Sequence, residues 1–428
     1  MTTPEPLPPS LYAATARPGP ATPPLDGDIA ADVAVIGAGF TGLSTALHLA
    51  EQGANVVVLE AHEPGWGASG RNGGQVNPGL KWEPDDVERT FGPDLGARLV
   101  RFAWGAPEAT FDLIRRHQIE CDARQGGTMR AGYLARDADS VRRLAEQCQR
   151  RGMPVTLLEG DAARRATGTS RYLAVLHDAS GGDVQPLDYA RGLAAAAMKA
   201  GAKIHGGTPV TGLNATGRGW SVATPRGTVR ANAVVVGTNG YSDDLVPGLR
   251  RTVVPAFSAI AASEPLDPAL AAKVMPSGGV LYEAARITTY YRLDKARRLL
   301  MGGRGPQRRD VDIGDLSHLT NYAVRLWPDL KGVRWTHAWS GQVALTTDQY
   351  PHVHQPQRGL YTCVGYNGRG VAFSTVMGGE LAKLALGKPA SEIHLPVTPI
   401  KPIAMHAFWR VGFTAKLIEL RLRDRFGI

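Results

Sequence analysis

The pattern of apolar and polar residues is most regular over residues 32–60. An apolar run, typical of a buried strand, leads into a G-x-G-x-x-G turn at residues 37–42. Apolar residues at helical spacing then continue to Gly53, and a second apolar run, 56–59, ends at Glu60. This succession of strand, glycine turn, helix, strand and acid, with the acid about 20 residues after the glycines, is typical of a dinucleotide-binding βαβ unit.

Each glycine of the turn has a mechanical role in this interpretation. Gly37 permits the tight turn, Gly39 lets a pyrophosphate approach the backbone, and Gly42 lets helix and strand pack closely. The helix offers unpaired N–H groups and a positive dipole end to the phosphates. Glu60 can accept hydrogen bonds from both ribose hydroxyls and disfavours a 2′-phosphate. A glycine turn in another α/β protein is the alternative, which the complete pattern makes the weaker one.

Three later segments have patterns that suggest ligand contacts. The loop 65–75 is rich in glycine, which implies close backbone approach to a ligand, although a flexible surface loop is the alternative. The apolar strand 233–236 is followed by Thr238 and Asn239, at the end of a strand where α/β sheets place ligand contacts. A second glycine turn, 367–371, opens an apolar helix whose N-terminus suits an electron-rich group.

Composition narrows the class of protein. The 428 residues are 43% hydrophobic and 20% charged, which is ordinary for a globular protein of two domains. No apolar run reaches the roughly 18 residues of a membrane helix. The proline-rich N-terminus has no basic apolar signal, so we expect neither a secretory peptide nor a membrane anchor there, but an extended arm.

Charge and cysteine content exclude further classes. The net charge of +9 comes from scattered arginines, so we expect a basic solvated surface or steering of an acidic substrate rather than nucleic-acid binding. Cys121, Cys148 and Cys363 are far apart, which predicts no disulfide framework, no metal site and a cytoplasmic location.

Six segments together resemble the D-amino-acid oxidase superfamily of FAD-dependent oxidoreductases, and within it the gamma-glutamylputrescine oxidase-like branch. These segments are 32–42, 65–75, 234–242, 290–303, 339–351 and 365–379. The resemblance implies an α/β (α+β) two-domain fold, with a Rossmann-type FAD-binding domain and a discontinuous substrate domain built on an antiparallel sheet.

The expected domains follow from this resemblance. They are a proline-rich arm at 1–27, an FAD-binding domain at 28–90, 155–250 and 335–395, a substrate domain at 91–154 and 251–334, and an amphipathic tail at 396–428. The tail is basic; we expect it to pack on the FAD-binding domain, with peripheral contact to an anionic membrane as the less favoured alternative.

The resemblance also implies which residues bind FAD, and we expect the cofactor to be non-covalent. The expected cofactor-binding residues are Gly37, Ala38, Gly39, Thr41, Gly42, Glu60, Ser69, Arg71, Asn72, Gly73, Gly74, Val210, Thr238, Asn239, Gly341, Gly368, Gly370 and Val371. Some members carry a lysine used in oxygen activation where this chain has Ala372, and Cys363 lies a strand before the position that tethers flavin covalently.

Four residues are candidates for the reaction itself: Tyr290, Arg292, Trp339 and Arg369. Tyr290 and Arg292 share one face of a predicted strand, where an arginine could clamp a substrate carboxylate; ordinary sheet packing is the alternative. Trp339 could line a pocket or belong to the core. Arg369, in the second glycine turn, is placed to stabilise a reduced flavin.

The implied reaction is hydride transfer from a carbon that bears an amine to flavin N5, followed by imine hydrolysis and reoxidation by oxygen or another acceptor. The substrate is a small amine or amino acid. A D-amino acid or glycine/sarcosine-type oxidase or dehydrogenase is one alternative, and a non-catalytic FAD-binding subunit of an oxidase complex is another.

Overall fold

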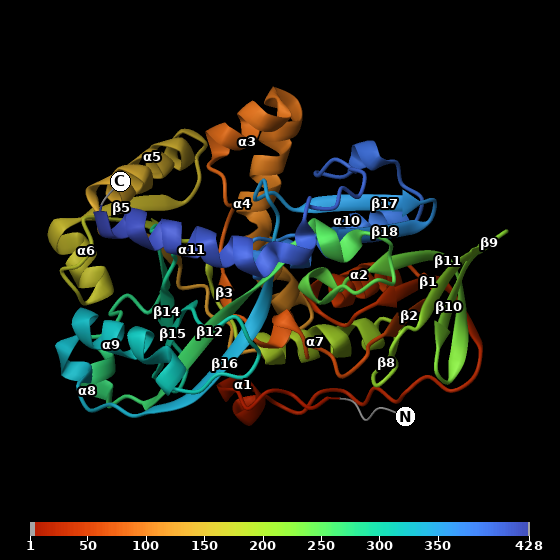
Figure 1. The fold of residues 1–428 in the computed structure, drawn as a ribbon, viewed down its shortest axis with the longest axis horizontal. Helices are drawn as coiled ribbons and strands as arrows, with labels where there is room; N and C mark the ends of the chain where they lie inside the picture. The colour runs from red at the N-terminus through yellow and green to blue at the C-terminus, as the bar shows by residue number, and fades with distance from the viewer. Residues whose placement is uncertain (1–4, 427–428) are drawn as a thin grey trace.

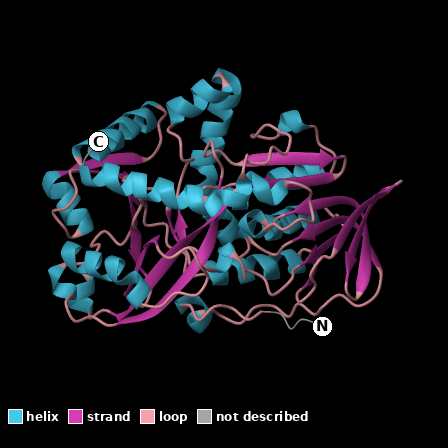
Figure 2. Ribbon diagram, in the orientation of Figure 1, coloured by secondary structure: helices cyan, strands magenta, loops and turns pink. Residues whose placement is uncertain are grey.

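The computed structural model describes residues 5–426, with side chains as far as residue 420. Within this part of the chain, two large sheets of eight strands each dominate the fold, one on either side of the view in Figure 1. Figure 2 shows helices covering both groups of strands.

The first sheet carries the predicted βαβ unit at its centre. Its path runs β17 (His352–Gln357), β18 (Leu360–Val364), β11 (Gly227–Val236), β1 (Ile29–Ile36), β2 (Val56–Leu59) and β8 (Lys203–His205), with β9 (Gly212–Thr216) and β10 (Gly219–Thr224) attached through β11. The strands from β18 to β8 are parallel. Parallel strands end together, so their carboxyl ends form one edge for a ligand.

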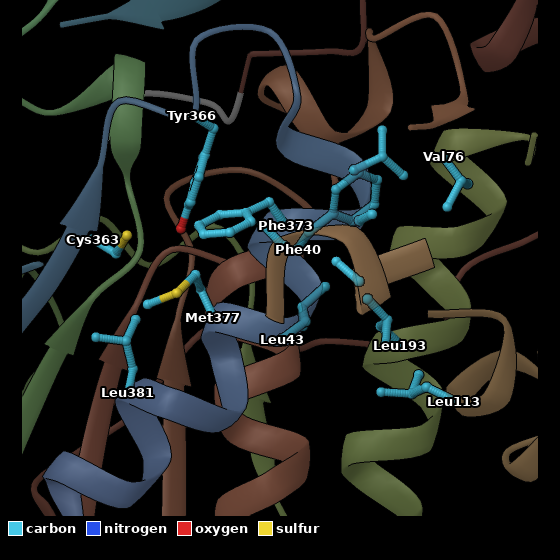
Figure 3. Packing of buried hydrophobic residues seen from close by; sticks show 14 of the residues in the cluster. Phe40, Leu43, Val76, Leu113, Leu193, Cys363, Tyr366, Phe373, Met377 and Leu381 are labelled. Carbon is cyan, nitrogen blue, oxygen red and sulfur yellow. The ribbon is translucent and has the colours of Figure 1, made fainter. Parts of the chain in front are cut away.

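Four helices cover one face of this sheet. They are α2 (Phe40–Glu51), α4 (Pro93–Arg116), α7 (Pro186–Lys199) and α10 (Gly370–Ala385). Figure 3 shows Phe40, Leu43, Leu193, Phe373 and Met377 packed among them in the largest buried cluster. The helix α4 is preceded by α3 (Pro84–Phe91), and Gly92 separates the two with φ at +82°.

The second sheet is antiparallel except at one pair. Its order is β16 (Trp335–Leu345), β12 (Val254–Pro265), β15 (Arg298–Arg304), β14 (Tyr290–Leu293), β13 (Val280–Glu283), β4 (Thr128–Gly132), β6 (Ala174–Asp178) and β5 (Val155–Glu159). The parallel pair is β4 with β13. One face packs on α6 (Gly160–Thr167), α8 (Pro268–Ala271) and α9 (Ser317–Leu326), around Tyr291 and Trp327.

The remaining elements are short or peripheral. They are α1 (Leu11–Thr15), α5 (Ala135–Arg150), α11 (Trp409–Phe426) and the two-stranded ladder of β3 (Gln75–Val76) with β7 (Gly182–Asp183). No helix among the described residues is both long and apolar enough to cross a membrane.

Sheet membership differs from the expected domain boundaries at three places. The strands β5 and β6 belong to the second sheet, although residues 155–250 were assigned to the FAD-binding domain. The strand β16 also lies in the second sheet, so the boundary at 335 falls too early. Conversely, α4 packs in the core of the first sheet rather than with the second. Strand pairing between distant segments decides these memberships, and a local apolar pattern carries no information about it.

Both terminal segments lie against the protein. The described part of the arm packs through Leu11, Tyr12 and Leu25, which are almost fully buried. The tail was expected on the FAD-binding domain, and its first residues do lie there, since the N–H of Thr398 donates to the carbonyl of Val353 on β17 at 2.8 Å.

The helix α11 of the tail lies elsewhere. It crosses in front of the second sheet in Figure 1, and its Phe413 ring lies 5.2 Å from the guanidinium of Arg304 on β15. Residues 1–4 of the arm and 427–428 of the tail fall outside the described residues.

Candidate functional site

A cavity of about 480 Å³ lies between the two sheets. At one end it is lined by Gly37, Glu60 and Thr238, which follow β1, β2 and β11 at the carboxyl edge of the first sheet. At the other end it is lined by Ser258 and Tyr290 of the second sheet. The cavity therefore connects the region expected to hold a nucleotide with the region expected to hold a substrate.

Most of the predicted site residues line this cavity: Gly37, Gly39, Thr41, Glu60, Ser69, Arg71, Asn72, Gly73, Val210, Thr238, Asn239, Tyr290, Gly341, Gly368, Arg369, Gly370 and Val371. The predicted residues outside its lining are Ala38, Gly42, Gly74, Arg292 and Trp339.

The first glycine turn has the geometry that its sequence predicts. Gly37 has φ at +98°, a conformation that residues with a Cβ rarely adopt. A Cβ at Gly42 would lie 2.0 Å from the carbonyl oxygen of Gly37, so only glycine lets α2 pack this closely. Gly39 caps α2 without a side chain, and the N–H of Phe40 donates to Ser69 Oγ at 2.9 Å. The helix N-terminus is thereby presented to the cavity beside a serine.

Glu60 ends β2 as a buried carboxylate at the cavity. It accepts hydrogen bonds from the backbone N–H groups of Ala38, at 2.7 Å, and His62, at 2.9 Å. Burial raises the pKa of Glu60, while these two N–H groups oppose the shift. An acceptor positioned here by the turn itself fits the ribose hydroxyls of a nucleotide.

The glycine-rich loop 65–75 is held by its own polar side chains. Asn72 donates to the carbonyl of Ser69 at 2.9 Å and accepts from the N–H of Gly74 at 2.8 Å. Arg71 donates to the carbonyl of Trp66 at 2.8 Å, and its guanidinium stacks on that ring at 4.4 Å. The loop is therefore an ordered wall of the cavity rather than a flexible surface segment.

The second glycine turn reaches the same cavity from the other end of the chain. Gly368 has φ at +83°, and Asn367 accepts a hydrogen bond from the N–H of Thr346 at 2.9 Å. The two turns meet directly, because the hydroxyls of Tyr366 and Thr41 are 2.7 Å apart. Residues separated by more than 300 positions thus form one continuous lining.

Arg369 lies at the substrate end of the cavity. It donates to the carbonyl of Pro78 at 2.6 Å and to the hydroxyl of Tyr282 at 3.0 Å, and its guanidinium is 4.9 Å from the Tyr282 ring. Its Nε is buried without a hydrogen-bond partner in the described protein, and so is Oδ1 of Asn77, which also lines the cavity. Buried polar atoms without a partner are uncommon, so two of them on residues that line one cavity are consistent with a site for a polar ligand.

The face of the second sheet that borders the cavity carries a row of polar side chains. Arg130, Tyr282 and Tyr290 lie opposite one another on β4, β13 and β14. Burial raises the pKa of Tyr290 to about 12, and its hydroxyl is 3.0 Å from Ser258 Oγ. Tyr290 therefore stays protonated at neutral pH.

Arg292 shares the face of Tyr290, as predicted, but it is not free to clamp a substrate. Its guanidinium pairs with Asp183 at 2.7 Å and donates to the carbonyls of Gly73, at 2.8 Å, and Val184, at 3.2 Å. It is only 3% exposed and does not line the cavity. An ion pair and backbone acceptors consume the donors that a carboxylate would need.

Trp339 belongs to the core rather than to the cavity wall. It is 2% exposed, its ring meets Tyr12 edge-on at 5.0 Å, and its indole N–H donates to the carbonyl of Arg71 at 2.9 Å. Trp339 therefore stabilises the loop 65–75 through this hydrogen bond, without lining the cavity. Trp66, by contrast, lines the cavity.

Sequence reasoning missed several cavity residues, among them Lys81, Tyr282, Thr288 and Tyr366. Tyr366 directly precedes the second glycine turn, and this position in the sequence could have identified it as a cavity residue. Lys81 lies in an irregular segment between β3 and α3, where neither periodicity nor a motif marks it.

The residues present fit FAD. The cavity offers a helix N-terminus beside glycines, an acid after β2 and a path to the second sheet. All three cysteines lie within the described residues and are buried outside the cavity lining, so their placement supports a non-covalent cofactor.

Comparisons with known proteins agree that this chain is of a kind that binds FAD. Residues 32–384 match the family described as FAD dependent oxidoreductase. The chain is 34% identical to gamma-glutamylputrescine oxidoreductase of Escherichia coli, covering 98% of this chain and 99% of that protein. It is 31% identical to a probable oxidoreductase, OrdL, of Rhizobium meliloti, covering 97% of each.

The fold is also found among solved structures. A glycine oxidase from Geobacillus kaustophilus superimposes with a TM-score of 0.72 at 24% identity, covering 88% of this chain and 99% of that one. The match to the family spans most of the sequence and includes both glycine turns that line the cavity. This chain is therefore an FAD-dependent oxidoreductase of the D-amino-acid oxidase superfamily.

Proposed function

We propose that this chain oxidises an amine that carries a carboxylate elsewhere in the molecule, of the kind represented by γ-glutamylputrescine. The product is an imine, which water converts to an aldehyde and ammonia. The main support is the 34% identity to gamma-glutamylputrescine oxidoreductase over nearly the full length of both chains. Bound FAD supplies the hydride acceptor.

In this proposal the two turns divide the cofactor between them. Gly37, Gly39 and Thr41 hold the pyrophosphate and Glu60 holds the ribose, because they stand at the N-terminus of α2 and the end of β2. Gly341 and the turn before α10 border the flavin ring. Ala38, Gly42 and Gly74 act by shaping the backbone around the cavity.

The substrate end combines aromatic walls with positive charge. Tyr282 and Tyr290 form the walls, and Arg369 supplies a cation without an acidic partner of its own within the described residues. Such a site attracts a carboxylate and lowers the pKa of a substrate ammonium. Both effects favour the reactive neutral form of an amine whose carboxylate is bound, because only a neutral amine has a lone pair.

Oxidation of an amino acid at its α-carbon is the second candidate. The same guanidinium would also suit an α-carboxylate beside the reacting amine, as in glycine, sarcosine or a D-amino acid. The electron acceptor, oxygen or another oxidant, is open in both proposals, and we infer a cytoplasmic location from the reduced cysteines.

An anaerobic screen tests the proposal. The purified holoprotein is mixed with γ-glutamylputrescine, putrescine, glycine, sarcosine or D-alanine, and loss of flavin colour is followed. We expect γ-glutamylputrescine to bleach the flavin at a lower concentration than putrescine, which lacks the carboxylate. Bleaching by the amino acids alone would select the second candidate, and bleaching by none would contradict both.

A further inference from the structure

Lys81 is the cavity-lining group whose chemistry the proposed function leaves unused. It lies between β3 and α3, and its side chain is exposed to the cavity. It makes no hydrogen bond and no ion pair within the described residues. A lysine that faces a cavity without an acid beside it is unusual, since an ammonium is strongly hydrated and normally finds an anion or bulk water.

The charges around Lys81 are mainly positive. Arg369 acts on it from the turn before α10, Arg304 from β15 and Arg130 from β4. Two acids of this region are engaged elsewhere: Glu83 pairs with Arg130 at 3.7 Å, and Asp178, on β6, accepts from Ser180. Like charges oppose protonation of an amine, so this setting favours the neutral form of Lys81.

Desolvation inside the cavity, together with these arginines, lowers the pKa of Lys81 to about 7. Other titratable groups on the cavity are unsuited to exchange a proton there. Tyr290 has a pKa raised to about 12, Glu60 lies at the nucleotide end, and His62 is occupied by stacking on Trp66 and by the N–H of Glu5. Among the described residues that line the cavity, only Lys81 has an amine, and that amine has no hydrogen-bond or ion-pair partner.

We propose that Lys81 is the base that accepts the proton from the substrate's ammonium group at the substrate end of the cavity. The N–H bond of the ammonium breaks, its electron pair stays on the substrate nitrogen, and the proton bonds to the Nζ lone pair of neutral Lys81. The substrate leaves this step as a neutral amine and Lys81 as an ammonium, which later returns the proton to water. The inference rests on the proposed amine oxidation.

The three neighbouring arginines give the step its direction. All three disfavour protonation of Lys81, and Arg369, which lines the cavity, can also bind the carboxylate of the substrate. A carboxylate base in place of Lys81 would form an ion pair with these arginines and lose basicity. Because guanidinium groups hold their protons at all ordinary pH values, Arg369, Arg304 and Arg130 cannot replace Lys81 in this role.

A labelling experiment tests the state of Lys81 without any turnover. The holoprotein is acetylated with trace acetic anhydride between about pH 5 and about pH 10, and each lysine is quantified by mass spectrometry. We expect Lys81 labelling to reach half its maximum near pH 7. Exposed Lys388 in the same digest gives the reference curve. A Lys81 curve that follows that of Lys388 would overturn the inference.

Variants test the role in the reaction. With an amine that reduces the wild-type flavin, Lys81→Met should slow reduction at about pH 7 by about 10²- to 10⁴-fold, the usual contribution of a general base. The difference should narrow toward about pH 10, where the free amine is already neutral. FAD content and thermal unfolding should match the wild type, and Lys388→Met is the control for the loss of a lysine.

Lys81→Arg separates a base from a mere positive charge. It places a permanent positive charge there but cannot accept a proton, so it should be as slow as Lys81→Met. Rescue by Lys81→Arg, or a defect that is constant with pH, would contradict a proton-accepting role. If no amine reduces the wild-type flavin, the proposed function fails and this role with it; if the wild type is reduced and the Lys81 variants match it, only the present inference fails.

Discussion

The two ends of the cavity are built by different means. The nucleotide end is made of backbone: a glycine at φ +98°, a helix N-terminus and N–H groups that fix Glu60. The substrate end is made of side chains on a sheet, where Arg130, Tyr282 and Tyr290 stand in a row across three strands. Backbone geometry limits which residue types fit in the glycine turn, whereas many side chains can stand on a sheet face. The residues of the nucleotide end are therefore restricted by the backbone that binds the cofactor, whereas the side chains of the substrate end can differ with the substrate.

The largest effect should come from a charged residue of the second sheet that does not touch the cavity. Arg292→Leu leaves Asp183 buried with only Arg124 as a cationic partner, so we expect the free energy of unfolding to fall by about 3–5 kcal/mol. Urea denaturation measures this fall, and Arg101→Leu on the exposed face of α4 is the control. An unchanged stability with only a raised KM would restore Arg292 as a substrate clamp.

The next effect breaks the nucleotide end. Gly42→Ala places a Cβ 2.0 Å from the carbonyl oxygen of Gly37, so the turn must shift at a cost of about 1–3 kcal/mol. We expect FAD affinity to fall about 10- to 100-fold in a fluorescence titration of the apoprotein. Gly105→Ala, whose Cβ meets nothing within 4 Å, should bind FAD as the wild type does. Equal FAD affinity in both variants would show that the close packing of α2 at Gly42 is not needed for cofactor binding.

A smaller effect tests the substrate end directly. Arg369→Met removes hydrogen bonds to Pro78 and Tyr282 and one cation, so we expect anaerobic flavin reduction to slow about tenfold while FAD stays bound. Stopped-flow absorbance measures the rate, and Arg358→Met, on an exposed arginine outside the cavity, is the control. Reduction at the wild-type rate would remove Arg369 from the reaction.

The smallest effect concerns pH. Burial raises the pKa of Glu60, so the folded apoprotein holds this proton more tightly than the unfolded chain. Stability should therefore fall as pH rises from about 4.5, the unfolded value, through the raised folded pKa. Glu60→Gln should flatten this slope in denaturation of the apoprotein and weaken FAD binding, whereas exposed Glu392→Gln should do neither. An unaltered slope in Glu60→Gln would place the titration elsewhere.

The same contrast explains what the sequence could predict. The strand–turn–helix at residues 29–51 and the cavity position of Glu60 follow from glycines whose spacing leaves few conformations. The membership of β5, β6 and β16 in the second sheet could not be predicted, because it depends on pairing between segments far apart in the chain. Gly368 and Arg369 were found because a glycine turn again preceded a helix.

The residues of the substrate end could not be predicted correctly from the sequence, because their roles also depend on tertiary contacts. Arg292 and Trp339 have the residue types of a binding site, but the fold gives them an ion pair and a packing position. Lys81 has no motif and lies in an irregular segment, so only the tertiary structure brings it to the cavity. Residue type alone does not tell a buried structural arginine from one that awaits a ligand.

Acid precipitation of the purified holoprotein tests the central account most directly. The account places one dissociable FAD across both glycine turns of each chain. It predicts a yellow protein that releases one FAD per chain into the acid supernatant and leaves a colourless pellet. A preparation that holds no flavin after incubation with excess FAD, or a pellet that retains the colour, would contradict it.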